Sequence, residues 1–246
     1  MSQPQLQGAA VRYHHFLLII VTGLFSFGEA SLAQDASPAT SKDTLELPTP
    51  LKSYGMSRTP DGDLLLVGGH TGPMHQFVAQ YYSADSWTYD ASENSWSRME
   101  SQLAAPRYGF QLFSSEKHTY AFGGSINHNE AENGSSRSIE RLDHETQQWE
   151  ELSTVFPDPR SAYVGGVIGG KAYLVLGWSN NAEDLDFDDV YHRDVLVFDL
   201  KTERFVDNNF ALPKEYIGRR NPCAALNREN QLLIFGGMTD ADVSGR

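Results

Sequence analysis

The feature that most constrains this chain is a short hydrophobic run ending in glycine that recurs four times. The first glycines of the four runs are Gly68, Gly123, Gly177 and Gly236, so the steps are 55, 54 and 59 residues. The runs themselves span Asp63–Gly69, Thr119–Gly124, Ala172–Trp178 and Gln231–Gly237. A period in this range indicates an array of similar supersecondary units that bury their hydrophobic faces against one another.

Two further signals keep the same phase. An apolar residue stands seven positions before a large aromatic residue in three units, as Tyr89/Trp96, Leu142/Trp149 and Phe198/Phe205. A basic residue precedes each glycine run by 16 or 17 positions, namely Lys52, Arg107, Arg160 and Arg220. Chance matches would drift out of phase, so each repeat is one structural unit.

Each unit is predicted to be a four-stranded antiparallel sheet. The strands are short, and pairs such as Asp61-Gly62 and Gly169-Gly170 are typical of hairpin turns. No window shows a sustained helical period. The sequence therefore predicts an all-β chain with 14 strands, forming three complete units and half of a fourth.

These repeats resemble kelch repeats, the blades of one class of β-propeller. The matching residues are Pro106-Arg107, Phe122-Gly-Gly124, Leu142-Asp-x5-Trp149 and Tyr89-Asp90-x5-Trp96. The resemblance covers about Leu51 to Arg246 and implies a partial kelch-type propeller, with blades at about 51–101, 106–153 and 159–208 and a half-blade at 219–246. Trp178 is interpreted as a replacement for the second glycine of its doublet, and Phe205 as a replacement for the usual Trp.

An incomplete propeller has two open faces that expose apolar edges. We expect either that the chain is a truncated version of a longer protein or that it associates with another copy through these edges. Truncation is the preferred interpretation.

The first 33 residues are predicted to be a secretory signal peptide. Arg12 precedes the apolar stretch Phe16–Phe27, which is too short to span a bilayer, and cleavage is expected after Ala33. Residues 34–50 form the expected linker. The predicted location is secreted or periplasmic, and an uncleaved membrane anchor is the alternative.

Composition excludes several partners and sites. A net charge of −13 argues against nucleic acid and anionic membrane surfaces as partners. The single cysteine, Cys223, excludes an internal disulfide and a multi-cysteine metal site. It is predicted to be buried in a first strand. No cofactor or metal is expected: His70 and His75 have no identifiable third ligand, and the acidic segment Glu183–Asp189 is interpreted as a solvated loop.

The candidate binding residues are Arg107, Arg160, Arg220 and Trp178. Because first strands line the channel of a propeller, the three arginines and Lys52 are expected to form a ring at one mouth, where they could bind carboxylates. The alternative is that the arginines brace the blades. Trp178 is a candidate stacking platform for a sugar ring, and packing between blades is its alternative.

The preferred function is a non-enzymatic binding module that holds a protein loop or a glycan on one propeller face. The repeats are also similar to the periplasmic kelch sialic-acid mutarotases (N-acetylneuraminate epimerase). That resemblance implies an anion contact from Arg107 or Arg160 and an acid/base residue, for which Glu116 and Asp158 are the nearest candidates in sequence. A third possibility is a non-functional fragment of a longer kelch protein.

Overall fold

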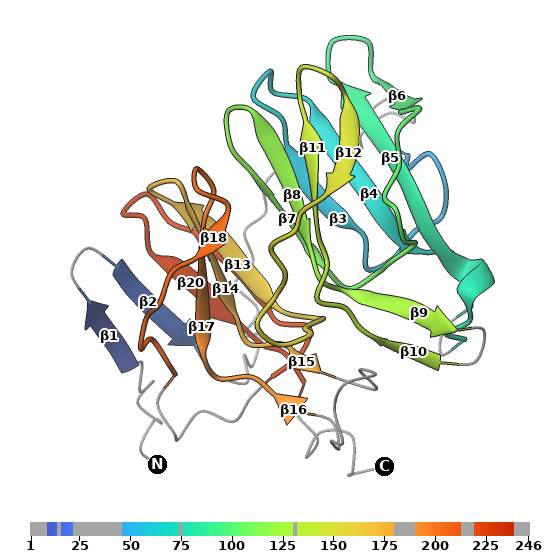
Figure 1. The fold of residues 1–246 in the computed structure, drawn as a ribbon. Coiled ribbons are helices and arrows are strands. Elements are labelled where there is room, and N and C mark those ends of the chain that lie inside the picture. The colour runs from blue at the N-terminus through green and yellow to red at the C-terminus, as the bar shows by residue number, and fades with distance from the viewer. Residues whose placement is uncertain are drawn as a thin grey trace, which may run out of the picture.

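The computed structural model describes residues 9–13, 16–21, 46–73, 76–129, 132–179, 190–212 and 219–238. Within these residues the regular secondary structure is β-strand, apart from one helical turn, the 3-10 element η1 (Ala79–Tyr81). The strands gather into separate four-stranded sheets that fan out side by side, as Figure 1 shows. The predicted all-β class is confirmed.

Three of the sheets are the predicted four-stranded antiparallel blades. Blade 1 contains β3 (Gly55–Arg58), β4 (Leu64–His70), β5 (Tyr82–Asp90) and β6 (Ser95–Arg98), in that spatial order. Blade 2 contains β7 (Gln111–Ser114), β8 (His118–Phe122), β11 (Ile139–Asp143) and β12 (Gln148–Glu151). Blade 3 contains β13 (Val164–Ile168), β14 (Lys171–Val175), β17 (Val195–Asp199) and β18 (Arg204–Phe205).

The fourth sheet combines the two ends of the described chain. Its antiparallel pair β19 (Cys223–Leu226) and β20 (Leu232–Phe235) is the predicted half-blade. A hairpin of β1 (Ala9–Tyr13) and β2 (Phe16–Val21) extends this sheet, and β2 pairs with β20 in parallel. In the three complete blades the corresponding third strand is antiparallel to the second. The sequence did not predict that these N-terminal residues enter a sheet.

Two small hairpins leave the blades just after the glycine-ended strands. The first consists of β9 (Ser125–Asn129) and β10 (Glu132–Ser135), and the second of β15 (Trp178–Ser179) and β16 (Val190–Tyr191). In Figure 1 both lie on the lower side of the fan.

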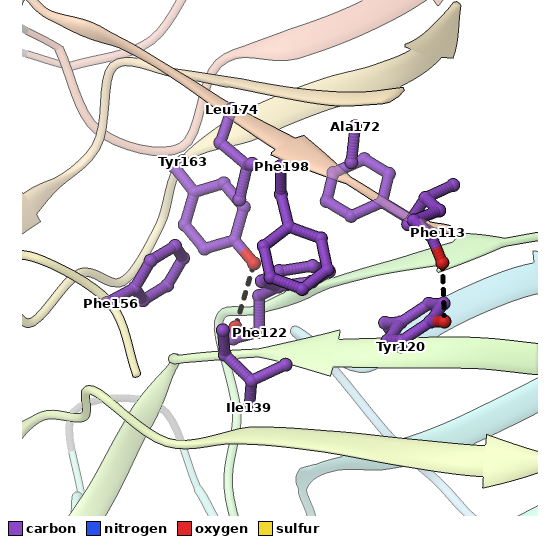
Figure 2. Close-up of a cluster of buried hydrophobic side chains, with 10 residues drawn as sticks. Phe113, Tyr120, Phe122, Ile139, Phe156, Tyr163, Ala172, Leu174 and Phe198 are labelled. Atoms are coloured by element: carbon purple, nitrogen blue, oxygen red, sulfur yellow. Dashed lines mark hydrogen bonds between the residues drawn. The ribbon is translucent and has the colours of Figure 1, made fainter. Parts of the chain in front are cut away.

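The hydrophobic core is divided into clusters between successive blades. The aromatic cluster between blades 2 and 3 is shown in Figure 2, where Phe122 and Phe198 pack edge to face with ring centroids 4.9 Å apart. The hydroxyl of Tyr163, from blade 3, donates a hydrogen bond of 2.7 Å to the carbonyl of Phe122 in blade 2. A Cβ on Gly123 would lie 2.4 Å from the carbonyl oxygen of Arg160, so only glycine allows the blades to approach this closely.

The aspartate of each repeat shapes the hairpin between the third and fourth strands. Oδ1 of Asp90, Asp143 and Asp199 accepts hydrogen bonds from the backbone N–H groups two and three residues further on. These side-chain bonds fix the turn that brings the repeat aromatic residue back against the third strand. This geometry explains why an aspartate stands six residues before the repeat aromatic residue.

Cys223 was predicted to be buried, and this prediction is wrong. The residue lies in β19, but its side chain is exposed. In this fan of sheets β19 has blade 3 on one side only, so half of its side chains face away from the rest of the described chain.

Candidate functional site

The inner ends of the blades are joined by a chain of backbone hydrogen bonds. One residue per repeat, just before the first strand, has a left-handed backbone: Ser53, Gly109, Ala162 and Asn221, with φ between 51° and 66°. The N–H of each of the last three donates to the carbonyl of the one before it, and each bond is 2.7 Å long. These four residues therefore mark the true equivalent positions of the repeats.

This register corrects the alignment of the basic residues by one position in the first and the last repeat. At the end of each second strand one glycine donates its N–H to a carbonyl of the next blade, over 2.7 to 2.9 Å. The donors Gly69, Gly124 and Gly177 bond the carbonyls of Arg107, Arg160 and Arg219, in that order. The equivalent of Arg107 and Arg160 is thus Arg219. Arg220 is instead equivalent to Lys52, Tyr108 and Ser161, so the predicted ring of four basic side chains does not form.

Arg107 is completely enclosed within blade 2. It forms an ion pair with Glu140 of β11, and both side chains are 1% exposed. Its guanidinium also donates to the carbonyl of Gly123 over 2.9 Å, while Glu140 accepts a hydrogen bond from the N–H of Ala104. Burial raises the pKa of Glu140 and lowers that of Arg107, because each charged form is removed from water.

Arg160 makes the corresponding contact in blade 3. Its Nη2 lies 2.9 Å from both carboxylate oxygens of Asp194, and its side chain is fully buried. Burial alone would raise the pKa of Asp194, but hydrogen bonds from His192 and Arg160 hold it well below its ordinary value. Arg107 and Arg160 therefore brace their own blades, and neither lines the cavity described below.

The residue after each glycine doublet pairs with the residue before the left-handed position. The pairs are Lys52 with His70, Tyr108 with Ser125, Ser161 with Trp178, and Arg220 with Met238. In the third repeat the left-handed doublet is Leu176-Gly177, with φ of 64° and 88°. Trp178 is therefore not a replaced glycine: Leu176 replaces the first glycine, and Trp178 is the residue after the doublet.

A cavity of about 320 Å³ lies among these paired residues. Its wall combines aromatic and apolar side chains, hydroxyl groups and one cation. The lining residues are Ser53, Phe77, Tyr108, Gly109, Ser125, Ser161, Ala162, Trp178, Arg220, Asn221 and Met238. Of the predicted site residues, the structure brings Arg220 and Trp178 together here.

Arg220 and Trp178 form the polar end of the cavity wall. The guanidinium carbon of Arg220 lies 4.0 Å from the centroid of the Trp178 ring, which is a cation–π contact. Nε of Arg220 is buried, and none of the described residues accepts a hydrogen bond from it. The guanidinium thus covers one face of the Trp178 indole.

Phe77 and Tyr108 form the aromatic part of the wall. Their rings are stacked at 5.6 Å, and Phe77 is 45% exposed. His70 follows the glycine doublet of the first repeat and is equivalent to Ser125, Trp178 and Met238. It is buried against the rings of Phe77 and Tyr108 and is not among the residues that line the cavity. Sequence reasoning missed this part of the site because Phe77 comes from a loop outside the repeat pattern.

The groups expected of a sugar mutarotase are not found at this cavity. Among the lining residues, which all belong to the described part of the chain, none is a carboxylate or a histidine. Glu116 lies in the turn between β7 and β8, at the opposite end of its hairpin from Gly123. Asp158 lies in the loop before Arg160. Burial lowers the pKa of that guanidinium, and the charges of Asp194 and Asp158 oppose the shift only in part.

The remaining candidates for ion binding yield no site. Within the described ranges, no group of three or more His, Cys, Asp or Glu side chains is placed to hold a metal ion. His75 and the acidic segment 183–189 lie outside the described residues.

Comparison with known proteins identifies the family. The model of the KLHDC2/KLHL20/DRC7 Kelch-repeats domain matches residues 34–237. The chain therefore belongs to the kelch-repeat family, and its sheets are kelch blades. Kelch-repeat domains generally serve as protein-interaction modules.

The proteins similar to the chain include two curated proteins. The F-box/kelch-repeat protein At1g67480 of Arabidopsis thaliana is 32% identical over 54% of this chain. The spermatocyte protein spe-26 of Caenorhabditis elegans is 31% identical over 80% of it. The chain spans about a third of each of these relatives, 33% and 31% of their lengths.

The solved structure of YjhT has the same fold. It superimposes with a TM-score of 0.55 at 16% identity, covering 73% of this chain and 57% of that one. Among the residues that the model describes, no helix has the length and apolar character needed to cross a membrane.

Proposed function

We propose that this kelch propeller is a protein-interaction module that binds an acidic segment of its partner at the cavity lined by Arg220 and Trp178. The observation that carries the proposal is the composition of that wall. In a chain of net charge −13, the described residues that line the cavity supply one cation, three serine hydroxyls and a group of aromatic and apolar side chains, and none of these described residues is acidic. An aspartate or glutamate that entered the cavity would meet the Arg220 cation and, among these described residues, no like charge.

The chemistry of the wall favours a carboxylate on an apolar segment. The guanidinium of Arg220 can donate to a carboxylate in the bidentate manner that arginine prefers. The serine hydroxyls can accept or donate further hydrogen bonds. Phe77, Tyr108 and Met238 offer apolar contact area to the rest of the segment, and both Phe77 and Met238 are more than 40% exposed.

A glycan is the second candidate ligand. Its support is Trp178, the residue that could stack on a sugar ring. Arg220 already covers one face of that indole, so a sugar could stack only on the other. A protein segment needs no free indole face and is therefore favoured.

A third element of the proposal is export from the cytoplasm. The apolar stretch Phe16–Phe27 and the small residues at Ser31 and Ala33 support cleavage after Ala33. Cleavage there would remove β1 and β2 and free the edge of β20.

A peptide display selection tests the proposed function. Wild-type chain is expected to enrich segments with an aspartate or glutamate beside apolar residues, whereas Arg220→Gln should lose that enrichment. Arg98→Gln is the matched control, because Arg98 is a surface arginine in β6. A parallel titration with N-acetylneuraminate and with a neutral hexose tests the glycan alternative. Selection of the same peptides by Arg220→Gln would refute the role of this cavity.

A further inference from the structure

The first repeat builds its part of the cavity wall differently from the later repeats. In those repeats the residue that follows the glycine doublet, Ser125, Trp178 or Met238, lines the cavity itself. In the first repeat this residue is His70, whose side chain is buried, and Phe77 from the following loop lines the cavity instead. This part of the wall therefore depends on how the loop is held against His70.

His70 ties this loop to blade 1 through its side chain. Nε2 of His70 lies 2.7 Å from the carbonyl oxygen of Gln76, the residue before Phe77. Because a carbonyl oxygen can only accept a hydrogen bond, Nε2 carries the proton and donates it. The backbone of His70 is itself held at the end of β4, where its N–H donates to the carbonyl of Lys52 over 2.9 Å and its carbonyl accepts from the N–H of Lys52 over 3.1 Å. The loop is thus attached to a paired part of the blade.

The imidazole ring of His70 also packs against the two aromatic rings of the wall. Its centroid lies 5.6 Å from that of Phe77 and 5.8 Å from that of Tyr108, and these two rings are stacked with an interplanar angle of 16°. The rings of Tyr81 and Tyr82 lie 5.9 and 5.8 Å from the same imidazole. His70 therefore contacts the ring of Phe77 and, through its proton, also holds the backbone that precedes it.

The other hydrogen bonds of this loop do not fix its middle. The N–H and the hydroxyl of Thr71 both donate to the carbonyl of Tyr81, over 2.8 and 3.1 Å, and these bonds close the base of the loop. The N–H of Gln76 donates to the carbonyl of Pro73 over 3.3 Å, within the loop itself. Among the hydrogen bonds of the described residues, only the one from His70 joins the middle of the loop to the blade.

We propose that His70 is a positioning residue for the cavity, and that its hydrogen bond to Gln76 holds Phe77 as the surface that selects an apolar side chain next to the acidic residue of the partner. The inference rests on the proposed function, because it assigns the specificity of the same site. Arg220 meets the carboxylate, and Phe77 meets the neighbouring side chain. Since two different residues recognise the two parts of the segment, the two preferences can be lost separately.

Three substitutions of His70 separate its hydrogen bond from its packing. His70→Phe keeps an aromatic ring but has no donor. His70→Gln loses the ring, but its amide nitrogen is as many bonds from Cα as Nε2 of histidine and can donate in its place. His70→Asn carries the same amide on a side chain that is one methylene shorter, so its donor does not reach the carbonyl of Gln76. The proposal predicts that only His70→Gln behaves like the wild-type chain.

Nuclear Overhauser contacts between the labelled rings of Phe77 and Tyr108 report the position of the loop in the full chain without any ligand. These contacts are expected in the wild-type chain and in His70→Gln, and they should be lost in His70→Phe and His70→Asn. Contacts that persist in His70→Phe would overturn the proposal. Equal loss in all three variants would also overturn it, because the ring of His70 and not its donor would then hold the loop.

Calorimetry on the full chain measures the selection, with short Gly/Ser peptides that carry Glu-Leu, Glu-Ala or Gln-Leu at the centre. Wild-type chain should prefer Glu-Leu to Glu-Ala about tenfold, because leucine adds three carbons of apolar surface. His70→Phe should lose this leucine preference but keep the preference for Glu-Leu over Gln-Leu. Phe77→Ser, which leaves His70 and its acceptor in place, should have the same effect.

His118→Phe is the matched control, because His118 is a half-buried histidine of β8 that does not line the cavity, and it should change neither preference. A leucine preference that survives in His70→Phe, or a loss of both preferences together, would overturn the role of His70. Equal affinity of Glu-Leu and Gln-Leu for the wild-type chain would instead contradict the proposed function, and the ring contacts would still decide whether His70 positions Phe77.

Discussion

The buried ion pair of blade 2 gives the sharpest stability prediction. Replacing Glu140 by alanine would leave the guanidinium of Arg107, which is 1% exposed, without its counter-ion. The N–H of Ala104 would also lose its acceptor. Breaking a buried pair from one side costs about 3–5 kcal/mol, because an uncompensated charge remains in a low-dielectric environment. We expect Glu140→Ala to lower the free energy of unfolding by this amount in urea titrations followed by circular dichroism.

A double substitution separates the pair from simple loss of packing. In Arg107→Met/Glu140→Leu both charges are replaced by apolar groups of similar size, and such replacements are often neutral or stabilising. The double variant should therefore be more stable than Glu140→Ala. The exposed pair Arg98–Asp85 supplies the control: Asp85→Ala should cost less than about 1 kcal/mol. Equal losses from Glu140→Ala and Asp85→Ala, or a double variant less stable than Glu140→Ala, would refute the bracing role of Arg107.

Three further predictions concern Trp149, Asp199 and the N-terminus. Trp149→Ala should lower the free energy of unfolding by about 3–5 kcal/mol. Trp149→Phe should lower it by less, since phenylalanine loses the bond to Ser86 but keeps most of the packing. A loss under about 1 kcal/mol for Trp149→Ala would mean that the indole is not packed between blades. The hydrogen bond from Lys171 and those from the turn backbone hold the pKa of Asp199 well below its ordinary value in the folded chain. The stabilisation from the ionised carboxylate is therefore present above about pH 4 and is lost as the pH falls. Asp199→Asn should weaken the fall of the free energy of unfolding at acid pH, and an unchanged fall would contradict this. Mass spectrometry of the exported protein should find Gln34 as the N-terminal residue, whereas a mature form that retains Met1 would contradict cleavage after Ala33.

The strand order of the blades could be predicted because it leaves a strong periodic signal. Glycine doublets, the hairpin aspartate and the repeat aromatic residue each serve the same purpose in every blade, so they recur in phase. The aspartates illustrate this, since all three fix the same turn with the same two backbone bonds.

The exact register of the last repeat could not be predicted from side chains. The positions that define it are occupied by Ser53, Gly109, Ala162 and Asn221, which share a left-handed backbone but no chemistry. Aligning basic residues instead chose Arg220, although Arg219 fills the bracing position. Arg220 nevertheless lines the cavity, although the alignment that selected it was wrong.

The cavity could be predicted only in part. Trp178 and Arg220 stood out as a large aromatic and a cation at repeat positions, and both line it. Phe77 lies in a connecting loop, where no periodic signal exists, and Tyr108 and Met238 fill positions where other repeats have unrelated residues. A comparison of the residues after each glycine doublet, His70, Ser125, Trp178 and Met238, is the signal that would have located the wall.

The affinity of an acidic peptide for the full chain tests the proposed function most directly. Isothermal titration calorimetry would compare a selected peptide that contains one glutamate with its glutamine counterpart, on wild-type chain and on Arg220→Gln. A charge-assisted hydrogen bond contributes about 1.5–3 kcal/mol, so either change alone should weaken binding by about 10- to 150-fold. Because both changes remove the same contact, the two together should cost little more than one. Equal affinity of both peptides for the wild-type chain, or full retention of glutamate preference by Arg220→Gln, would contradict the assignment of this cavity as the site of an acidic segment.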